Sequence, residues 1–296
     1  MVAVELSHIA KAFGAVQAVS DVSFTVNQGE IFGLLGPNGS GKTTSIRVML
    51  DIFKGDAGKV SVLGGPMNEA KKNRIGYMPE ERGLYQDMRL EECLIYLTTL
   101  KGISKAEAQR RLQPYLERFD LAEHKTKKIK ELSKGMQQKA QIISTVLHQP
   151  ELLLVDEPFS GLDPVNSQLA RQLFLDLQKQ GVTILMSTHQ MHQVEEMCHR
   201  IVLIHRGRNV LYGNLTDIRR EHSGHAVRVR LTGELPPLAG VLNRSEENGS
   251  WQLLLDERTT PQDILHQLVG SGAAVEQFEI ALPSLDEIFI RVVGKE

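Results

Sequence analysis

A short glycine-rich turn constrains this chain more than any other feature of its sequence. The apolar run Ile31–Leu35 is typical of a buried strand, and a turn follows it in which Gly36, Gly39 and Gly41 let the backbone bend sharply. Successive backbone N–H groups in such a turn converge on an anion, at the positive end of the helix that begins at Lys42. The residues expected to hold the phosphates are Gly36, Pro37, Asn38, Gly39, Ser40, Gly41, Lys42, Thr43 and Thr44. The pattern predicts a nucleoside triphosphate site, with the Thr43 hydroxyl on Mg²⁺.

Length, composition and charge limit the number of domains in this chain and the kinds of partner it can have. A chain of 296 residues that is 41% apolar suffices for one large or two modest domains with real cores. Because 34 basic residues nearly balance 36 acidic ones, we expect no nucleic-acid partner. Cys93 and Cys198 fit no metal or redox spacing, which favours reduced, buried thiols in a cytosolic protein. No run of 18 apolar residues occurs, so we expect no membrane span.

Hydrophobic periodicity divides the first part of the chain into sheet and helix. Residues 2–6 and 22–26 alternate as half-buried strands do, and Leu152–Val155 is a fully apolar strand. From about 81 to 149 the apolar residues recur at helical spacing instead, over 90–102, 104–120 and 134–148. A helix at 164–180, a strand at 183–186 and a hairpin near 201–212 follow. The pattern predicts an α/β fold with a helical insertion.

The last quarter of the chain has its own pattern. Its expected order is strand 226–231, strand 251–255, helix 261–270, strand 274–281 and helix 283–293. We therefore expect one domain over 1–220 and a small accessory α+β domain over 221–296, joined by the polar stretch 219–225.

Two acids and a histidine come directly after predicted strands. Asp156 and Glu157 end the strand Leu152–Val155, where Asp156 is placed to bind Mg²⁺ and Glu157 to act as a general base. His189 lies just past the strand 183–186, which suits a sensor of the γ-phosphate. These three residues and the phosphate loop predict hydrolysis of the nucleotide.

The stretch Leu132–Gln137, LSKGMQ, comes at the start of a predicted helix about twenty residues before Asp156. With it, the chain from Val2 to about Arg220 resembles the ATP-binding subunits of ABC transporters. The ordered motifs that carry the resemblance are Phe13, the phosphate loop, Tyr77–Glu80, Leu132–Gln137, Leu153–Glu157, Ser160–Asp163 and His189. The resemblance implies a P-loop NTPase cassette, which has a RecA-like core, an antiparallel β subdomain and a helical subdomain. It also implies ATP and Mg²⁺ as cofactors, with Phe13 as a stacking platform for the base.

The resemblance also implies partners. Two cassettes of this family clamp head to tail, so Ser133 and Gly135 of one would reach the γ-phosphate held by the other, while Asp163 belongs to the loop that links the two sites. The second cassette is either another copy of the chain or a paralogue. Transport needs a path through the bilayer, so we expect a separate integral membrane subunit that holds this cytoplasmic chain at the inner face of the membrane.

Three positions depart from the commonest family pattern. Lys134 and Met136 stand where Gly and Gln are usual, although Ser133 and Gly135 are kept. Glu80 stands where Gln is usual, which adds a third acid that could bind Mg²⁺. These departures and the C-terminal sequence PSLDEIFIRVVG resemble the branch that serves sodium or drug exporters.

Other classes remain as alternatives. A soluble ABC-type ATPase that is not coupled to transport would share these motifs, but such proteins usually carry two cassettes or a long coiled-coil insertion. A GTPase would carry a guanine-reading Asn-Lys-x-Asp motif, which does not occur. His189, His192 and His199 stand close together, but their spacing does not place all three on one helical face, which disfavours a metal site.

Overall fold

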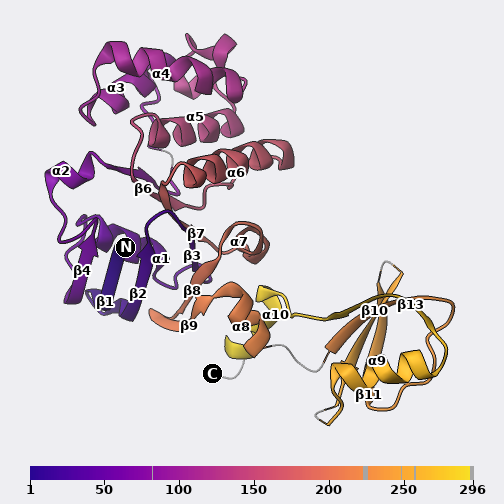
Figure 1. Cartoon of the computed structure of the whole chain (residues 1–296). Coiled ribbons are helices and arrows are strands. Elements are labelled where there is room, and N and C mark those ends of the chain that lie inside the picture. The colour runs from indigo at the N-terminus through magenta and orange to yellow at the C-terminus, as the bar shows by residue number, and fades with distance from the viewer. Residues whose placement is uncertain (82, 223–225, 248, 257, 294–296) are drawn as a thin grey trace. The chain divides into compact units, whose positions relative to one another are not determined.

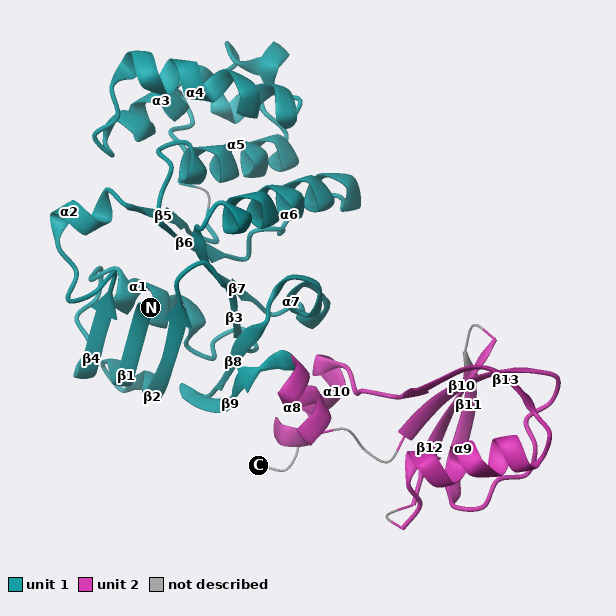
Figure 2. Ribbon diagram, in the orientation of Figure 1, with its two compact units in different colours: residues 1–215 teal, residues 216–296 magenta. Residues whose placement is uncertain are grey.

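The computed structural model describes residues 1–81, 83–222, 226–247, 249–256 and 258–293. It divides into two units, residues 1–215 and residues 216–296 (Figure 2). The sequence places the boundary after residue 220, which is inside helix α8 (Leu215–Glu221). The predicted linker 219–225 is therefore wrong in its first residues, and 223–225 lie outside the described residues.

A nine-stranded sheet organises the first unit, in the order β4-β1-β2-β9-β8-β3-β7-β6-β5 (Figure 1). Its strands are β1 (Val2–Phe13), β2 (Val16–Asn27), β3 (Ile31–Leu35), β4 (Ala57–Val62), β5 (Ile75–Met78), β6 (Leu152–Asp156), β7 (Thr183–Thr188), β8 (Arg200–His205) and β9 (Arg208–Asn214). Strands β8, β3, β7, β6 and β5 run parallel to one another. Strands β3, β6 and β7 are buried on both faces; β3 and β6 are apolar almost throughout, and β7 has an apolar centre with polar residues at its ends.

The register of the parallel strands brings three loops to one edge. Leu35 pairs with Thr188, and Ser187 pairs with Asp156. The strands β3, β7 and β6 therefore end at the same level, and the residues that follow them meet at one place. Ligands of open parallel sheets bind outside the carboxyl ends of the strands, so the site is expected there.

Strands β4, β1 and β2 pair antiparallel at one end of the sheet, and β9 pairs antiparallel with β8. Helix α1 (Lys42–Met49) packs against β4, β1 and β2 and buries Ile46 and Met49. Phe24 on β2 and Phe32 on β3 stack with their ring centroids 5.3 Å apart, which joins the antiparallel strands to the parallel ones in one core.

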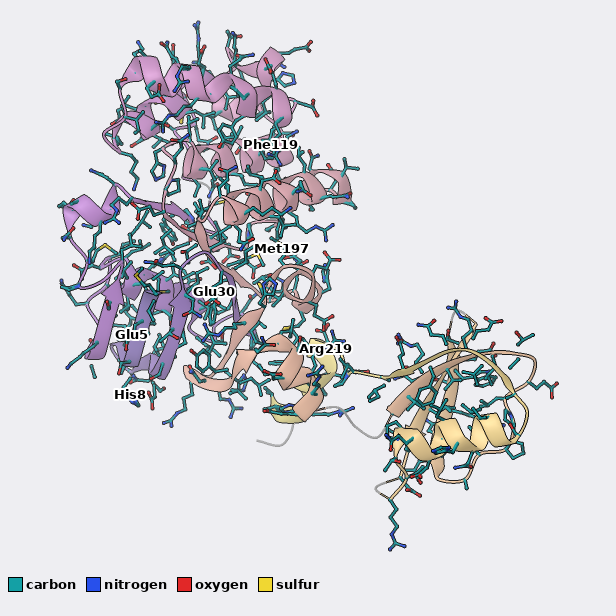
Figure 3. All side chains as sticks on the ribbon, in the orientation of Figure 1. Glu5, His8, Glu30, Phe119, Met197 and Arg219 are labelled. Carbon is teal, nitrogen blue, oxygen red and sulfur yellow. The ribbon has the colours of Figure 1, made fainter. Side chains whose placement is uncertain are left out.

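The helical insertion contains α3 (Leu90–Thr99), α4 (Lys105–Arg118) and α5 (Lys134–Val146), with two 3-10 turns at Ala122–His124 and Ile129–Glu131. Ser104 and Ser133 cap α4 and α5 by accepting from backbone N–H groups of the first turn. The fully buried Phe119, which Figure 3 labels, follows α4. The short helix α2 (Glu69–Lys72) precedes β5, and α6 (Pro164–Lys179) and α7 (Met191–Met197) follow β6 and β7.

The second unit contains a four-stranded antiparallel sheet in the order β11-β12-β10-β13. Its strands are β10 (Ala226–Thr232), β11 (Val241–Glu247), β12 (Ser250–Leu255) and β13 (Ala274–Ile280), and α9 (Pro261–Gly270) packs on it. The core consists of Val227, Val229, Leu253, Leu255, Ile264 and Leu268. Helix α10 (Leu285–Val293) follows β13, and the Arg219 side chain on α8, labelled in Figure 3, donates to Leu282 O and Pro283 O just before it.

The predicted α/β fold with a helical insertion, followed by a small C-terminal α+β domain, is confirmed. Among the α-helices and strands, three are absent from the prediction, namely α2, α8 and β11, and so are the two 3-10 turns. Helix α2 has four residues and buries none of them, and β11, with the sequence VLNRSEE, is polar at an edge of its sheet. Neither therefore carries the hydrophobic period on which sequence prediction depends.

Candidate active site

The phosphate loop, residues 36–44, joins β3 to α1 at the carboxyl edge of the sheet. Gly36 and Gly41 both have positive φ, and a Cβ at Gly36 would lie 2.1 Å from Ile204 O. A Cβ at Gly41 would lie 2.5 Å from Ala18 O. These two glycines are thus required by the close packing of the loop on β8 and β2, in addition to the approach of a phosphate.

Lys42 is buried at the first position of α1, and its Nζ donates to Gly36 O at 2.8 Å and Pro37 O at 3.2 Å. Burial lowers the pKa of Lys42, while the nearby carboxylates of Glu157, Asp156 and Glu80 act in the opposite direction. The loop thus folds around its own lysine, and the ammonium is held where an anion would meet it.

A cavity of about 510 Å³ opens beside this loop, and we call it the nucleotide cavity. Its lining comes from β2, the phosphate loop, the residues after β5 and the end of β6. The lining residues are Val16, Gln17, Ala18, Asn38, Gly39, Gly41, Lys42, Thr43, Thr44, Glu80, Asp156 and Glu157. Its volume is within the range of ordinary small-molecule sites.

Asp156 is 1% exposed at the end of β6 and is held from two sides. Thr43 Oγ1 donates to its Oδ2 at 2.7 Å, and the Ser187 hydroxyl donates to its Oδ1. Asp156 and Thr43 therefore offer neighbouring oxygen ligands at the floor of the cavity, the donor type that Mg²⁺ prefers.

Glu157 is 5% exposed and has a φ of 49°, which is rare for a residue other than glycine. Its Oε1 accepts from the His189 backbone N–H at 2.9 Å and lies 2.6 Å from His189 Nδ1, and its Oε2 accepts from Thr188 Oγ1 at 3.1 Å. The ends of β6 and β7 thus fix the carboxylate against the cavity wall. Left-handed backbone at a non-glycine residue recurs at functional sites, where surrounding contacts maintain it.

Two further predicted site residues, Glu80 and Phe13, are exposed, and only Glu80 lines the nucleotide cavity. Glu80 is exposed, follows β5 after Pro79, and lines the nucleotide cavity. Phe13, at the end of β1, is 43% exposed and packs edge-on against Phe53 with 5.1 Å between ring centroids. Phe13 is not among the residues that line the cavity, although β2 residues close to it in sequence are.

Ser133, Gly135 and Asp163 gather elsewhere in the first unit, at the neighbouring N-termini of α5 and α6. A Cβ at Gly135 would lie 3.6 Å from Gly161 O in the loop before α6. Ser133 Oγ accepts from the Met136 N–H at 3.2 Å, and Asp163 accepts from the Asn166 N–H at 2.9 Å. The Asn166 bonds to backbone and side chain lower the pKa of Asp163. None of the three lines the nucleotide cavity.

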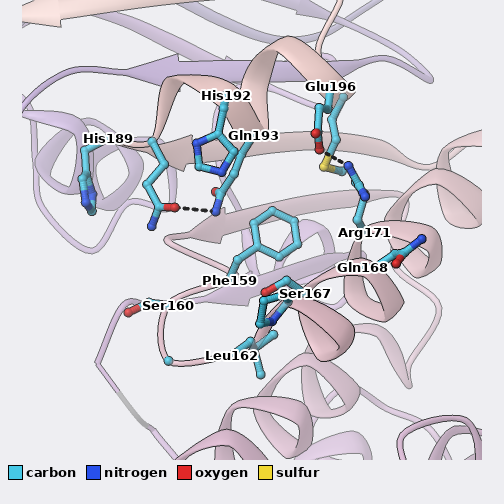
Figure 4. A pocket seen from close by; sticks show the side chains of 14 residues that line it. Phe159, Ser160, Leu162, Ser167, Gln168, Arg171, His189, His192, Gln193 and Glu196 are labelled. Carbon is cyan, nitrogen blue, oxygen red and sulfur yellow. Dashed lines mark hydrogen bonds and ion pairs between the residues drawn. The ribbon is translucent and has the colours of Figure 1, made fainter. Parts of the chain in front are cut away.

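A second cavity, of about 550 Å³, lies between α6, α7 and the loop from Phe159 to Leu162, and His189 forms part of its wall (Figure 4). The Arg171 guanidinium on α6 forms an ion pair with Glu196 on α7. One side of His189 thus faces this cavity, while its Nδ1 contacts Glu157.

Sequence reasoning missed the residues that hold the acids, Ser187 and Thr188. They are fully buried polar residues at the carboxyl end of the apolar strand β7. Asp156 and Glu157 occupy the same kind of position on β6, so the same signal would have indicated them. The wall formed by residues 16–18 of β2 has no such signal, since it depends on how β2 meets the phosphate loop.

Within the residues that the structure describes, no group of three or more His, Cys, Asp or Glu side chains is arranged to hold a metal ion. His189, His192 and His199 form no such group among the described residues. No helix of the described chain is long and apolar enough to cross a membrane.

Comparison with known proteins gives consistent results for both units. A family model described as "ABC transporter" matches residues 19–160, and one described as "ATP-binding protein DrrA1-3-like, C-terminal domain" matches residues 213–293. The chain is 42% identical to the uncharacterized ABC transporter ATP-binding protein YhaQ of Bacillus subtilis, over 98% of each chain. It is 32% identical to the Nod factor export ATP-binding protein I of Rhizobium sp. (strain N33), over 100% of this chain and 98% of the relative.

A solved structure titled "Structure of ATP binding subunit of ABC transporter" is also similar. It superposes with a TM-score of 0.69 at 34% sequence identity, over 74% of this chain and 92% of the other.

Proposed function

Because this chain belongs to the ATP-binding subunits of ABC transporters, we propose that it hydrolyses ATP to drive export of a substrate through a separate membrane subunit. One structural observation carries the proposal of hydrolysis. A buried carboxylate, Glu157, faces the nucleotide cavity and is held there by His189 and Thr188. Export is supported by the full-length similarity to a Nod factor export protein.

In this proposal Glu157 takes the proton from the attacking water. His189 senses the γ-phosphate, as the sequence leads us to expect, and also orients the Glu157 carboxylate. The 2.6 Å contact between His189 Nδ1 and Glu157 Oε1 supports this division of roles. Lys42 would release its loop carbonyls and turn to the β- and γ-phosphates, where charge builds up during the reaction. Phe13 would stack on the base at the open end of the cavity.

ABC cassettes pair with membrane subunits and dimerise. We propose that a second cassette, either another copy or a paralogue, completes the site with its own Ser133 and Gly135. The Ser133 oxygen accepts from Met136 within the helix cap, so its hydroxyl proton stays available to a phosphate. The Gly135 N–H lies in the first turn of α5, where backbone donors lack partners inside the helix. Asp163, at the neighbouring helix start, would connect the two sites.

The residues present fit a magnesium ion. Thr43, Asp156 and Glu80 offer only oxygen atoms, and all three line the same cavity. Mg²⁺ bound there would neutralise charge on the phosphates. Without it, Glu80, Asp156 and Glu157 place three carboxyl groups around one cavity, which disfavours binding of a further anion.

The role of Glu80 is tested by ATP affinity with Mg²⁺ and with EDTA. Glu80→Gln should bind metal-free ATP better than the wild type, because it removes one negative charge and keeps an oxygen ligand. Glu80→Ala should lose hydrolysis that Glu80→Gln largely keeps. Three indistinguishable proteins would show that Glu80 is not a ligand in the isolated subunit.

Coupling to transport is tested with the membrane protein that co-purifies with the tagged chain. Reconstituted together in vesicles, the two should hydrolyse ATP faster than the chain alone, and Glu157→Gln should remove the difference. If no membrane fraction of the host changes the ATPase activity of the chain, the alternative is favoured, namely an ABC-type ATPase not coupled to transport. The expected location is the cytoplasmic face of the cell membrane.

A further inference from the structure

Helix α5 contains two buried glutamines whose partners lie outside the helix. Gln138 and Gln141 are 4% and 3% exposed. They are three positions apart, so they lie on one side of the helix. A buried amide is costly unless its donors are satisfied, which makes the groups that these two side chains contact informative.

Gln141 holds the backbone on both sides of Glu80. Its Nε2 donates to Pro79 O at 2.8 Å and to Glu81 O at 3.3 Å. Only the amide nitrogen can donate to two carbonyl oxygens, so these contacts fix the orientation of the side chain. Glu80 itself is exposed on the wall of the nucleotide cavity. The position of an exposed acid is thus set by a buried amide from another element.

Gln138 makes the corresponding contact one turn earlier. Its Nε2 donates to Pro158 O at 3.0 Å, directly after Glu157. One helix therefore fixes the backbone beside two different carboxylates of the cavity, through two separate side chains. This gives a matched pair in which one amide acts beside Glu80 and the other beside Glu157.

We propose that Gln141 is a positioning residue that holds Glu80 at the nucleotide cavity and so sets how strongly nucleotide binding depends on Mg²⁺. The proposal rests on the role of Glu80 proposed above. Gln141 lies about two turns of α5 after Ser133. The helix therefore also connects Glu80 to the helix N-terminus that would meet the second cassette.

The test compares four proteins, namely wild type, Gln141→Met, Glu80→Ala and the double variant. Methionine keeps the length of the side chain and removes the donor. The first measurement is the Mg²⁺ concentration that gives half-maximal binding of a fluorescent ATP analogue. Gln141→Met should raise it about fivefold in the wild-type background and less than about twofold in the Glu80→Ala background, because residues that act together are not additive.

A second measurement needs neither metal nor nucleotide. Hydrogen exchange in a peptide covering residues 76–81 should be faster in Gln141→Met than in the wild type, since the clamp on Pro79 and Glu81 is lost. Unchanged exchange there would overturn the proposal. If Gln141→Met does not fold, as judged by its thermal transition, Gln141→Asn serves instead, because it keeps the amide but is too short to reach both carbonyls.

Gln138→Met is the matched control. It removes a donor from the same helix face but acts beside Glu157, so turnover should fall while the Mg²⁺ requirement stays at the wild-type value. An equal Mg²⁺ shift for Gln141→Met in both Glu80 backgrounds would refute the positioning role and leave the Glu80 ligand role intact. If Glu80→Ala alone leaves the Mg²⁺ requirement unchanged, the ligand role itself is refuted.

Discussion

Buried polar side chains distinguish the two units of the chain. In residues 1–215 one group of them gathers at the edge of the sheet, where Asp156, Glu157, Ser187 and Thr188 are at most 5% exposed and bond to one another or to the phosphate loop. In the described part of residues 216–296, Ser250 is the only buried polar residue. Burying a polar group without a partner costs free energy, so a cluster of such groups indicates a site.

Charged groups of the second unit instead pair on the exposed face of its sheet. Arg228 and Glu279 are opposite each other on β10 and β13, 3.2 Å apart and roughly half exposed. Exposed pairs of this kind contribute about 0–1 kcal/mol to stability and do not perturb chemistry. The comparison therefore predicts large functional effects from single changes in the first unit and small ones in the second.

The largest effect is expected for Glu157→Gln. The amide keeps the shape of the side chain and cannot accept the proton, so hydrolysis should fall by about 10² to 10⁴ while ATP binding is retained. Phosphate release measures hydrolysis, and ATP affinity measures binding. Because the bound ATP is not hydrolysed, two cassettes should stay together in size-exclusion chromatography when ATP is present. Glu279→Gln is the same chemical change in the second unit and should leave both values unaltered. Near-normal hydrolysis by Glu157→Gln would mean that Glu157 is not the base.

A somewhat smaller loss is expected for His189→Ala. Its Nδ1 lies 2.6 Å from the Glu157 carboxylate, so its removal frees the base from one of its contacts. Turnover should fall by about 10- to 100-fold with little change in ATP affinity. His192→Ala, on the adjacent helix and facing the second cavity, is the control (Figure 4). Equal losses in turnover and affinity would contradict an orienting role.

The contrast between the two units also explains how much of the structure could be predicted from the sequence. The acids Asp156 and Glu157 were predictable because they interrupt a strongly apolar strand, and the register of β3, β7 and β6 needed only the general rule for parallel sheets. The loop-closing contacts of Lys42 and the amide clamps of α5 were not predictable. The amide contacts of α5 join residues far apart in the sequence, such as Gln141 and Pro79, with no local pattern on either side. The contacts of Lys42 are local in sequence, but they depend on how the phosphate loop folds.

In the second unit, strand β11 was missed for a different reason, which is that its own sequence carries no hydrophobic pattern. Its residues Asn243, Arg244, Ser245 and Glu246 are all exposed, because β11 lies at the edge of its sheet. Without a buried face there is no alternation to detect. In the first unit, the surroundings of Phe13 could not be predicted from the sequence either, because the exposure of its ring and its contact with Phe53 are set by the tertiary fold.

Acid should destabilise the first unit through His148, which is 6% exposed at the end of α5 with Nε2 3.2 Å from Ile75 O. Burial lowers the pKa of His148 to about 4, below its ordinary value near 6.5. Between these values the unfolded chain binds a proton that the folded chain does not, so stability falls as the pH falls. The loss between pH 7 and pH 5 is about 2 kcal/mol.

His148→Leu should remove this part of the pH dependence. The measurement is urea unfolding of wild type and variant at pH 7 and pH 5, monitored on the transition of the first unit. A wild-type protein whose first unit is equally stable at both pH values would contradict the assignment, as would a variant with the same slope as the wild type.

The smallest effect is expected from removing residues 223–296, which make up most of the second unit. A chain that ends after His222 keeps α8 and all of the nucleotide cavity, whose described lining lies between Val16 and Glu157. Its ATP affinity should stay within about twofold of the full chain, because no described residue of the removed segment lines the cavity. Lys42→Ala in the same shortened chain should lose that binding, which shows that the measured affinity belongs to the phosphate loop. A shortened protein with a normal thermal transition that cannot bind ATP would refute this division of labour, and would assign to the removed segment a part in the nucleotide site.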